Sequence, residues 1–305
     1  MSLATVRVPA TTANLGPGYD AFGLALGLYN TFSAEPAGEW SVEVLGEGAD
    51  TLRRDAENRV AKAMAAGLDA AGLGGNAARI ATRNEIPPGR GLGSSAAAIV
   101  GGLMLADAFS EGALGRERVF ELAVAMEGHP DNVAAALFGG FTIGWTDAGS
   151  KAVSIQPAGG LAAVVVIADW ELSTLQARGM LPATLPHADA AFNAGRAGLV
   201  SAGLVLGRDD LLRAGLEDRL HEPYRSAAIP DFKLVTAALE DAGALGAVLS
   251  GAGPTVIGLV TGADDDAALD EARAVADRCA RPLSVIGGRR APLALRLDRE
   301  GAALL

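Results

Sequence analysis

The sequence predicts an α+β protein built from two domains. Strand-like and helical segments are mixed in both halves of the 305-residue chain, but they do not alternate as tightly as in a doubly wound α/β fold. The length suits two domains of ordinary size, each with its own core. A segment containing proline and glycine, residues 156–160, separates the halves. We therefore expect one domain over residues 1–155 and a second over 156–305.

The first half carries clear periodic patterns. Trp40–Leu45 alternates as a half-buried strand does, and Val60, Met64 and Leu68 fall on one face of a helix. Gly128 directly follows a further helical segment, as a C-cap glycine should. The expected strands cover residues 6–8, 22–32, 40–45, 78–82 and 137–145, the last bent by two glycines, and the expected helices cover 57–71, 95–109 and 116–127.

The second half begins with a run of apolar residues, 161–168, that is typical of a buried strand. Gly251–Pro254 is a turn between two short apolar segments, which reads as strand, turn, strand. The expected strands cover residues 161–168, 245–250, 255–260 and 293–297, and the expected helices cover 188–206, 209–220, 231–242 and 264–281.

Composition excludes several classes of protein. A net charge of −11 with scattered arginines argues against a nucleic-acid partner. The single cysteine, Cys279, cannot form an internal disulfide and is expected to be a small buried helix residue. The N-terminal residues lack the apolar region of a signal peptide, and no segment reads as a membrane span. We expect a cytoplasmic protein.

A glycine-rich loop at residues 87–97 is the most informative motif. Its alternate glycines permit positive φ and leave amides open to an anion, and its two serines stand where a helix begins. The shape of the loop indicates that it binds an anion, and its context indicates a nucleotide triphosphate. The alternative is that the loop binds nothing and is only a tight turn from a strand to a helix. The residues assigned to nucleotide binding are Pro87, Pro88, Gly89, Arg90, Gly91, Leu92, Gly93, Ser94, Ser95, Ala96 and Ala97.

The familiar nucleotide motifs fit this loop poorly. No glycine precedes any of the three lysines, Lys62, Lys151 and Lys233, so a P-loop is absent. The glycine spacing and the preceding prolines differ from a Rossmann turn, and the protein-kinase signatures are missing.

Other polar residues form candidate ligand sites. Asn14 and Asp20 lie in a sharply bent loop, where ligand contact and local capping are both reasonable roles. Glu127 ends a helix, where its charge opposes the dipole; a bound cation would offset this, and the alternative is a solvated helix end. A zinc site at His129 is rejected, because no second ligand stands at zinc spacing. Arg178 and Arg225, expected in loops, could grip a carboxylate or be solvated.

Three separated blocks resemble the motifs of the GHMP kinase superfamily of small-molecule kinases. They are residues 8–20, the loop 87–97, and residues 249–255. The resemblance implies an N-terminal ATP-binding domain like ribosomal S5 domain 2, a ferredoxin-like C-terminal domain that completes the substrate site, and an active site between them.

Within that superfamily, the first block and the segment His129–Asn132 are similar to the branch that phosphorylates the side-chain hydroxyl of L-homoserine with ATP, in threonine biosynthesis. The resemblance implies that Ser95 and Glu127 hold Mg²⁺, with Glu121 as the alternative acid. It also implies a nucleotide-base contact at Asn58 and substrate contacts from Asn14, Asp20, His129, Asn132, Arg178 and Arg225.

Three questions stay open at this point. Asp20 either accepts the hydroxyl proton as a base or mainly binds the substrate, while the proton passes to phosphate oxygen. The acceptor could instead be mevalonate or a sugar, or the chain could be a silent relative that only binds a ligand. The oligomeric state is open, with a homodimer as one option.

Overall fold

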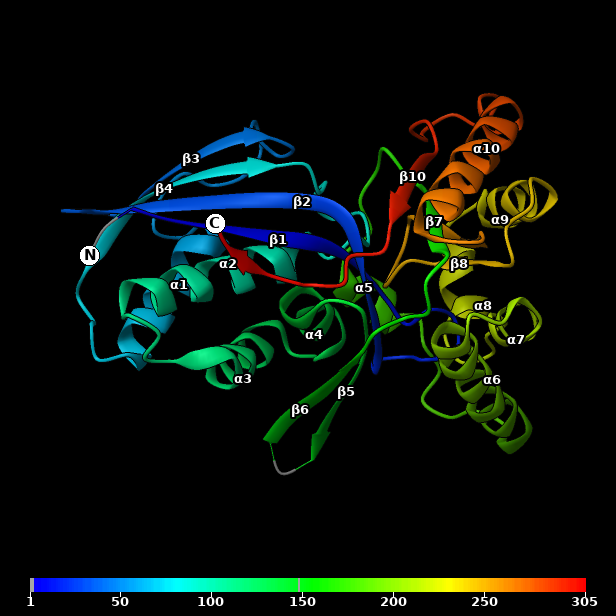
Figure 1. The fold of residues 1–305 in the computed structure, drawn as a ribbon, viewed down its shortest axis with the longest axis horizontal. Helices are drawn as coiled ribbons and strands as arrows, with labels where there is room; N and C mark the ends of the chain where they lie inside the picture. The colour runs from blue at the N-terminus through cyan, green and yellow to red at the C-terminus, as the bar shows by residue number, and fades with distance from the viewer. Residues whose placement is uncertain (1–2, 148) are drawn as a thin grey trace.

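Two antiparallel-rich sheets with helices packed on them form the protein (Figure 1). The computed structural model describes residues 3–147 and 149–305. In the described residues the first sheet has the order β11-β1-β2-β4-β3, β5 pairs with both β2 and β6, and only β3 and β4 run parallel. Its strands are β1 (Ala4–Ala13), β2 (Phe22–Ala37), β3 (Ser41–Gly46), β4 (Ala77–Asn84), β5 (Phe141–Asp147), β6 (Gly149–Ile155) and β11 (Ala303–Leu304).

Four helices cover one face of this sheet, and Figure 1 shows them beneath β1–β4. The central one is almost wholly apolar and is buried on nearly every side, as a core helix should be. Small residues allow its close contact with the preceding helix. The four helices are α1 (Arg59–Ala70), α2 (Ser94–Phe109), α3 (Gly115–Glu127) and α4 (Asp131–Phe138).

The second sheet has the order β10-β7-β9-β8, with all pairs antiparallel. Its strands are β7 (Leu161–Val166), β8 (Ala247–Leu249), β9 (Val256–Thr261) and β10 (Leu293–Arg296). The helices of this half are α5 (Thr174–Gly179), α6 (His187–Leu206), α7 (Asp209–Gly215), α8 (Glu222–Arg225), α9 (Phe232–Asp241) and α10 (Asp265–Leu283), with a 3₁₀ turn at Ser226–Ala228.

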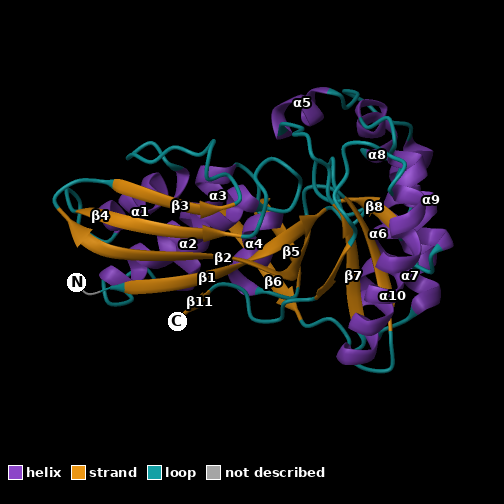
Figure 2. Ribbon diagram, turned by 90° about the horizontal axis from the view of Figure 1, so that it is seen from above, coloured by secondary structure: helices purple, strands orange, loops and turns teal. Residues whose placement is uncertain are grey.

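Strand β7 shows why this sheet is buried on both faces. Leu161, Ala163 and Val165 belong to the core that also contains the first sheet, whereas Ala162 and Val164 belong to the core under α9 and α10. Because side chains alternate along a strand, a run of apolar residues serves both cores. The packing therefore joins the two halves along a shared apolar core. Figure 2 shows β7 on the side of its sheet that faces the first sheet, with α9 and α10 beyond it.

The expected strand over residues 137–145 is wrong in its first part. Residues 131–138 form α4, and only from Phe141 does the chain enter β5. Gly139 and Gly140, both with positive φ, separate the two elements. A short helix buried nearly all round lacks the periodicity that separates helix from strand, which explains the error.

Other differences are smaller. The helix expected over 209–220 ends at Gly215, and strands β6 and β11 were not expected. Arg178 and Arg225 lie in the short helices α5 and α8 rather than in loops. The expected role of Cys279 is confirmed, because it is buried in α10, where burial raises the pKa of its thiol to about 11.

The division at residue 155 stays a prediction. The last strand of the first sheet before it, β6, ends at Ile155, and the second sheet starts at Leu161. The chain end then returns to the first sheet, where β11 pairs with β1. Among the described residues, no helix is both long and apolar enough to cross a membrane.

Candidate active site

The glycine loop adopts the backbone conformation that its sequence predicts. Gly89, Gly91 and Gly93 have φ of 69°, 82° and 69°, and Gly93 caps α2 in the left-handed region. A Cβ at Gly93 would lie 1.9 Å from the Oγ1 of Thr11, so a side chain is excluded there. The first amides of α2 and the positive end of its dipole are therefore presented at Ser94 and Ser95.

The second half of the chain holds this loop in place. The Ser250 hydroxyl donates to the carbonyl of Gly91 at 2.6 Å, which joins the loop to the segment 249–255. The guanidinium of Arg90 donates to the carbonyls of Ala168 and Asp169, at 2.9 Å each, and to the carbonyl of Pro88 in the loop itself at 3.1 Å. The side chain of Arg90 thus links the loop to the second half of the chain.

A cavity of about 890 Å³ lies beside the loop. It is walled by β4, the starts of α1 and α2, the end of α3 and α5. The predicted site residues that line it are Asn58, Pro88, Gly89, Ser94, Ser95, Glu127, His129 and Arg178. Leu92, Ala96 and Ala97 are buried beneath the loop and can contribute only backbone.

Two buried polar atoms line this cavity without a hydrogen-bond partner in the described part of the chain, the Oγ1 of Thr82 and the Oδ1 of Asn84. Both side chains are more than nine-tenths buried. Because they line a cavity, these two oxygens are available to accept hydrogen bonds from a ligand or from water. The sequence carried a signal for them, because they continue the buried face of β4 that begins with Ala78 and Ile80.

Asn58 is the N-cap of α1. Its Oδ1 accepts from the amide of Val60 at 3.0 Å, and its Nδ2 donates to the carbonyl of Arg53. The side chain therefore sets where α1 begins on the cavity wall.

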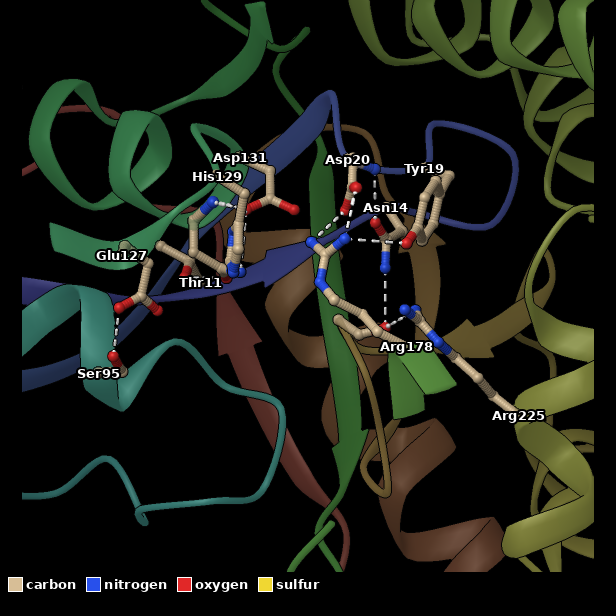
Figure 3. Close-up of polar contacts among 12 residues, drawn as sticks. Thr11, Asn14, Tyr19, Asp20, Ser95, Glu127, His129, Asp131, Arg178 and Arg225 are labelled. Atoms are coloured by element: carbon tan, nitrogen blue, oxygen red, sulfur yellow. Dashed lines mark hydrogen bonds and ion pairs between the residues drawn. The ribbon is translucent and has the colours of Figure 1, made fainter. Parts of the chain in front are cut away.

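Ser95 and Glu127 face each other across the end of the cavity (Figure 3). The Ser95 hydroxyl donates to Glu127 Oε2 at 2.5 Å. The alternative acid, Glu121, is half-exposed and pairs with Arg118 at 2.8 Å on the outer surface of α3. Sequence reasoning missed Arg59, whose Nη1 donates to the Ser95 hydroxyl and lies 3.3 Å from Glu127 Oε2.

A second, smaller pocket of about 100 Å³ adjoins the first. The two share a wall that includes Gly89, Ser95, Glu127 and Arg178. The small pocket is lined by the remaining predicted residues, Asn14, Asp20, Asn132 and Arg225, together with the turn Gly251–Gly253. The structure therefore brings all six predicted substrate contacts to one place.

Asp20 and Arg178 form a paired bidentate contact in this pocket (Figure 3). Arg178 donates to the two carboxylate oxygens of Asp20 at 2.7 and 2.8 Å, and also to the Tyr19 hydroxyl at 3.1 Å. The hydrogen bonds to Asp20 raise the pKa of Arg178 further above its usual value. Both side chains are about one-third exposed, so a small ligand can reach each of them.

Arg225 is only 2% exposed. Its Nη1 donates to the carbonyl of Gly251 and to Nδ1 of His221, at 3.3 Å each, and its guanidinium lies 5.1 Å from the Tyr19 ring centre. Burial lowers the pKa of Arg225 from its usual high value. An anion bound in the pocket would offset the cost of burying the Arg225 charge away from water.

Asn14 holds the pocket's first loop together. Its Oδ1 accepts from the Asp20 amide at 3.0 Å, and its Nδ2 donates to the Gly251 carbonyl at 2.8 Å. Asn14 and Asp20 have φ of 72° and 57°, a left-handed conformation that these residue types tolerate. Both ends of the Asn14 amide are thus engaged in positioning Asp20.

His129, just before α4, and Asn132, in its first turn, line the pocket at the start of this helix. Burial opposes the charged form of His129, but its 2.6 Å contact with Asp131 and the nearby Glu127 outweigh burial and raise its pKa. Asn132 accepts from the Thr11 hydroxyl at 2.7 Å. Sequence reasoning assigned no role to Asp131 or Thr11, although both stand within segments already singled out, residues 129–132 and 8–20.

Comparison with known proteins identifies the class of this fold and site. The family model described as the GHMP kinases N terminal domain matches residues 58–140, and the GHMP kinases C terminal model matches residues 191–280. The chain belongs to the GHMP kinase family.

Individual relatives narrow the comparison. The chain is 43% identical to the homoserine kinase of Streptomyces avermitilis, over 98% of this chain and 95% of that protein. It superposes on the crystal structure of homoserine kinase from Cytophaga hutchinsonii with a TM-score of 0.88 and 26% identity, covering 100% and 98% of the two chains. A mevalonate kinase crystal structure matches with a TM-score of 0.69 at 16% identity over 97% and 99%, a likeness in fold alone.

Proposed function

We propose that this kinase transfers the γ-phosphoryl group of ATP to the side-chain hydroxyl of L-homoserine, forming O-phospho-L-homoserine. The observation that carries the proposal is the small pocket with Asp20 and Arg178 that opens through a shared wall into the large cavity. The homoserine kinases among its relatives support the choice of acceptor.

The Asp20–Arg178 pair is complementary to an α-amino acid. Homoserine carries a carboxylate and an ammonium group, so its two charges can replace the two halves of this ion pair. Its carboxylate takes the place of Asp20 on Arg178, with Arg225 behind it, and its ammonium group takes the place of Arg178 on Asp20. Mevalonate has no ammonium group and would leave Asp20 without a partner.

The large cavity suits ATP. Its volume lies within the roughly 300–1,000 Å³ of common small-molecule sites, and the α2 N-terminus on its wall favours phosphate. The orphan oxygens of Thr82 and Asn84 suit the donor groups of a nucleotide base or ribose. Asn58 shapes this wall through the start of α1.

Ser95 and Glu127 fit a magnesium ion. Hydroxyl and carboxylate oxygens are ligands that Mg²⁺ prefers, and one or two protein ligands plus phosphates are its usual set. When bound, Mg²⁺ neutralises charge on the transferring phosphoryl group. The outward position of Glu121 supports Glu127 as the acidic ligand.

The protein's own part in the reaction is to align the two substrates. Arg178 and Arg225 hold the acceptor by its carboxylate, Asn14 positions Asp20, and Asn132 and His129 close the wall near the reacting hydroxyl. Asp20 binds the substrate in this scheme, and the hydroxyl proton passes to a phosphate oxygen. We also propose that the enzyme works in the cytoplasm. Light scattering would show whether it is a monomer or the homodimer left open above.

An ADP-release assay with an acceptor panel tests the proposal. We expect turnover with L-homoserine and none above background with mevalonate, galactose or deaminated homoserine. Preference for mevalonate or a sugar would assign the enzyme to another branch of the family. A chain that binds homoserine calorimetrically but releases no ADP with any acceptor would be a silent relative.

A further inference from the structure

Two charged residues stand at the unfavourable ends of their helices. Arg59 is the first residue of α1, where its positive charge meets the positive end of the dipole, and Glu127 is the last residue of α3, at the negative end. Asn58 already caps α1, so Arg59 is not needed to start the helix. Each position is explained instead by the contact between the two side chains.

The Arg59 guanidinium occupies the place where the proposed metal ligands meet. It donates to the Ser95 hydroxyl and lies 3.3 Å from Glu127 Oε2. These are the two oxygens assigned to Mg²⁺, so Arg59 and a divalent cation would compete for them. Glu127 is only 11% exposed, whereas Arg59 is 56% exposed, so the arginine is the partner free to move.

Arg59 is also the cation best placed for a bound polyphosphate. Among the described residues, the arginines on the wall of the large cavity are Arg53, Arg59 and Arg178, and no lysine lines it. Arg53 donates twice to Asp55, and Arg178 donates to both oxygens of Asp20. Arg59 stands between the N-termini of α1 and α2, where phosphate would be held.

We propose that Arg59 has two alternative positions in this enzyme. Without nucleotide it stands in for the metal ion and neutralises Glu127. When Mg²⁺ takes Glu127 and Ser95, Arg59 moves onto the nucleotide phosphates and supplies the cation that many kinases take from a lysine. The inference rests on the proposed metal site at Ser95 and Glu127.

Binding measurements on Arg59→Ala separate this role from a structural one. Mn²⁺ binding without nucleotide, followed by electron paramagnetic resonance, is expected to tighten about two- to fivefold, because a competing half-exposed ion pair is gone. ADP binding in the presence of a chelator is expected to weaken about tenfold, because a charge-assisted contact is lost. Arg59→Lys keeps the positive charge, so its ADP affinity should fall less than that of Arg59→Ala.

The matched control is Arg79→Ala, which removes another exposed arginine of the first half, on β4, that pairs with Glu35 on β2. Arg79→Ala should change neither the Mn²⁺ affinity nor the ADP affinity. If it changes both as Arg59→Ala does, the lower net charge alone explains the result and the proposal is wrong. If Arg59→Ala weakens Mn²⁺ and ADP together, or changes neither, Arg59 is a structural residue and the inference is wrong.

Glu127→Gln and Glu121→Gln distinguish this inference from the metal assignment. Glu127→Gln should abolish Mn²⁺ binding, while Glu121→Gln should leave it unchanged. If Glu127→Gln retains wild-type Mn²⁺ affinity, both the metal site and the role of Arg59 fail. If it loses Mn²⁺ but Arg59→Ala behaves as wild type, only the role of Arg59 fails.

Discussion

At the scale of single residues, the proposed function makes the ion pair between Asp20 and Arg178 the feature that selects the acceptor. We expect Arg178→Ala to raise the homoserine KM roughly 10- to 100-fold, the value of charged hydrogen bonds, with little change in the ATP KM. Steady-state kinetics measure both. Arg208→Ala is the control, because Arg208 is an exposed arginine that also pairs with one carboxylate, Asp210. Unchanged homoserine kinetics in Arg178→Ala would refute the carboxylate clamp.

The role of Asp20 is tested by a conservative change. Asp20→Asn keeps the size and an acceptor oxygen but loses the charge that faces Arg178 and the substrate ammonium group. We expect the homoserine KM to rise more than kcat falls, because we propose that Asp20 binds the substrate and does not act as the base. A large fall in kcat at unchanged KM would show that Asp20 acts as the base.

Some of these residues were predictable and others were not. Asn14, Asp20 and Ser95 stand in motifs with glycine or helix-start signals, so their place in a site follows from local chemistry. The contact between Arg178 and Asp20 joins positions 158 residues apart, and no local pattern encodes it. The direction of a long side chain is equally a tertiary property, and no local pattern encodes the contact of Arg90 with the carbonyl of Ala168.

At the scale of elements, the close packing of α1 on α2 positions the nucleotide end of the site. A Cβ at Gly102 would lie 2.4 Å from the Val60 carbonyl, a backbone atom in the first turn of α1. We expect Gly102→Ala to destabilise the protein by about 1–3 kcal/mol through overpacking. ADP affinity should also fall, because the start of α1 must shift.

Gly195→Ala provides the comparison in the longest helix, α6. A Cβ there would meet no atom within 4 Å, so the change should stabilise the protein by about 0.5–1 kcal/mol. Urea unfolding and ADP titration measure both variants. If both variants changed the free energy of unfolding equally and with the same sign, the overpacking of α1 against α2 would not explain the effect of Gly102→Ala.

The helices and strands with one apolar face were predictable, because the spacing of apolar residues along each segment shows its periodicity. Helices α1 and α3 and strand β3 lie within two residues of the expected bounds. The error at α4 arose where burial on all sides removes periodicity, and β11 is too short for any pattern.

At the scale of the whole molecule, a buried acid links folding to pH. Burial raises the pKa of Glu222 to about 8 from an ordinary value of 4.5; Asp218 and Glu240 add to the shift, while the Leu249 amide and Arg225 oppose it. Between these values the folded protein keeps the proton that the unfolded chain releases. This contribution to stability is therefore complete below about pH 4.5 and is lost as the pH rises through 8.

Glu222→Gln removes the titrating group and keeps an oxygen that can accept from the Leu249 amide, as Glu222 Oε1 does at 2.5 Å. We expect the free energy of unfolding of the variant, relative to wild type, to rise as the pH increases across this window. Chemical unfolding at several pH values measures the difference. Glu217→Gln, an exposed neighbour, should give a flat difference; a flat difference for Glu222→Gln would contradict the buried protonated acid.

The sequence by itself was enough to predict the family and the α+β class, and to propose the nucleotide loop and most of the residues of the candidate site. These depend on local properties: periodicity, glycine conformations and the chemistry of short motifs. The tertiary structure decided which side chains meet: Arg178 on Asp20, Ser95 on Glu127, and Arg59 on both of the latter. Such contacts depend on how distant elements pack, and packing is set by the shared core of the two sheets rather than by any one segment.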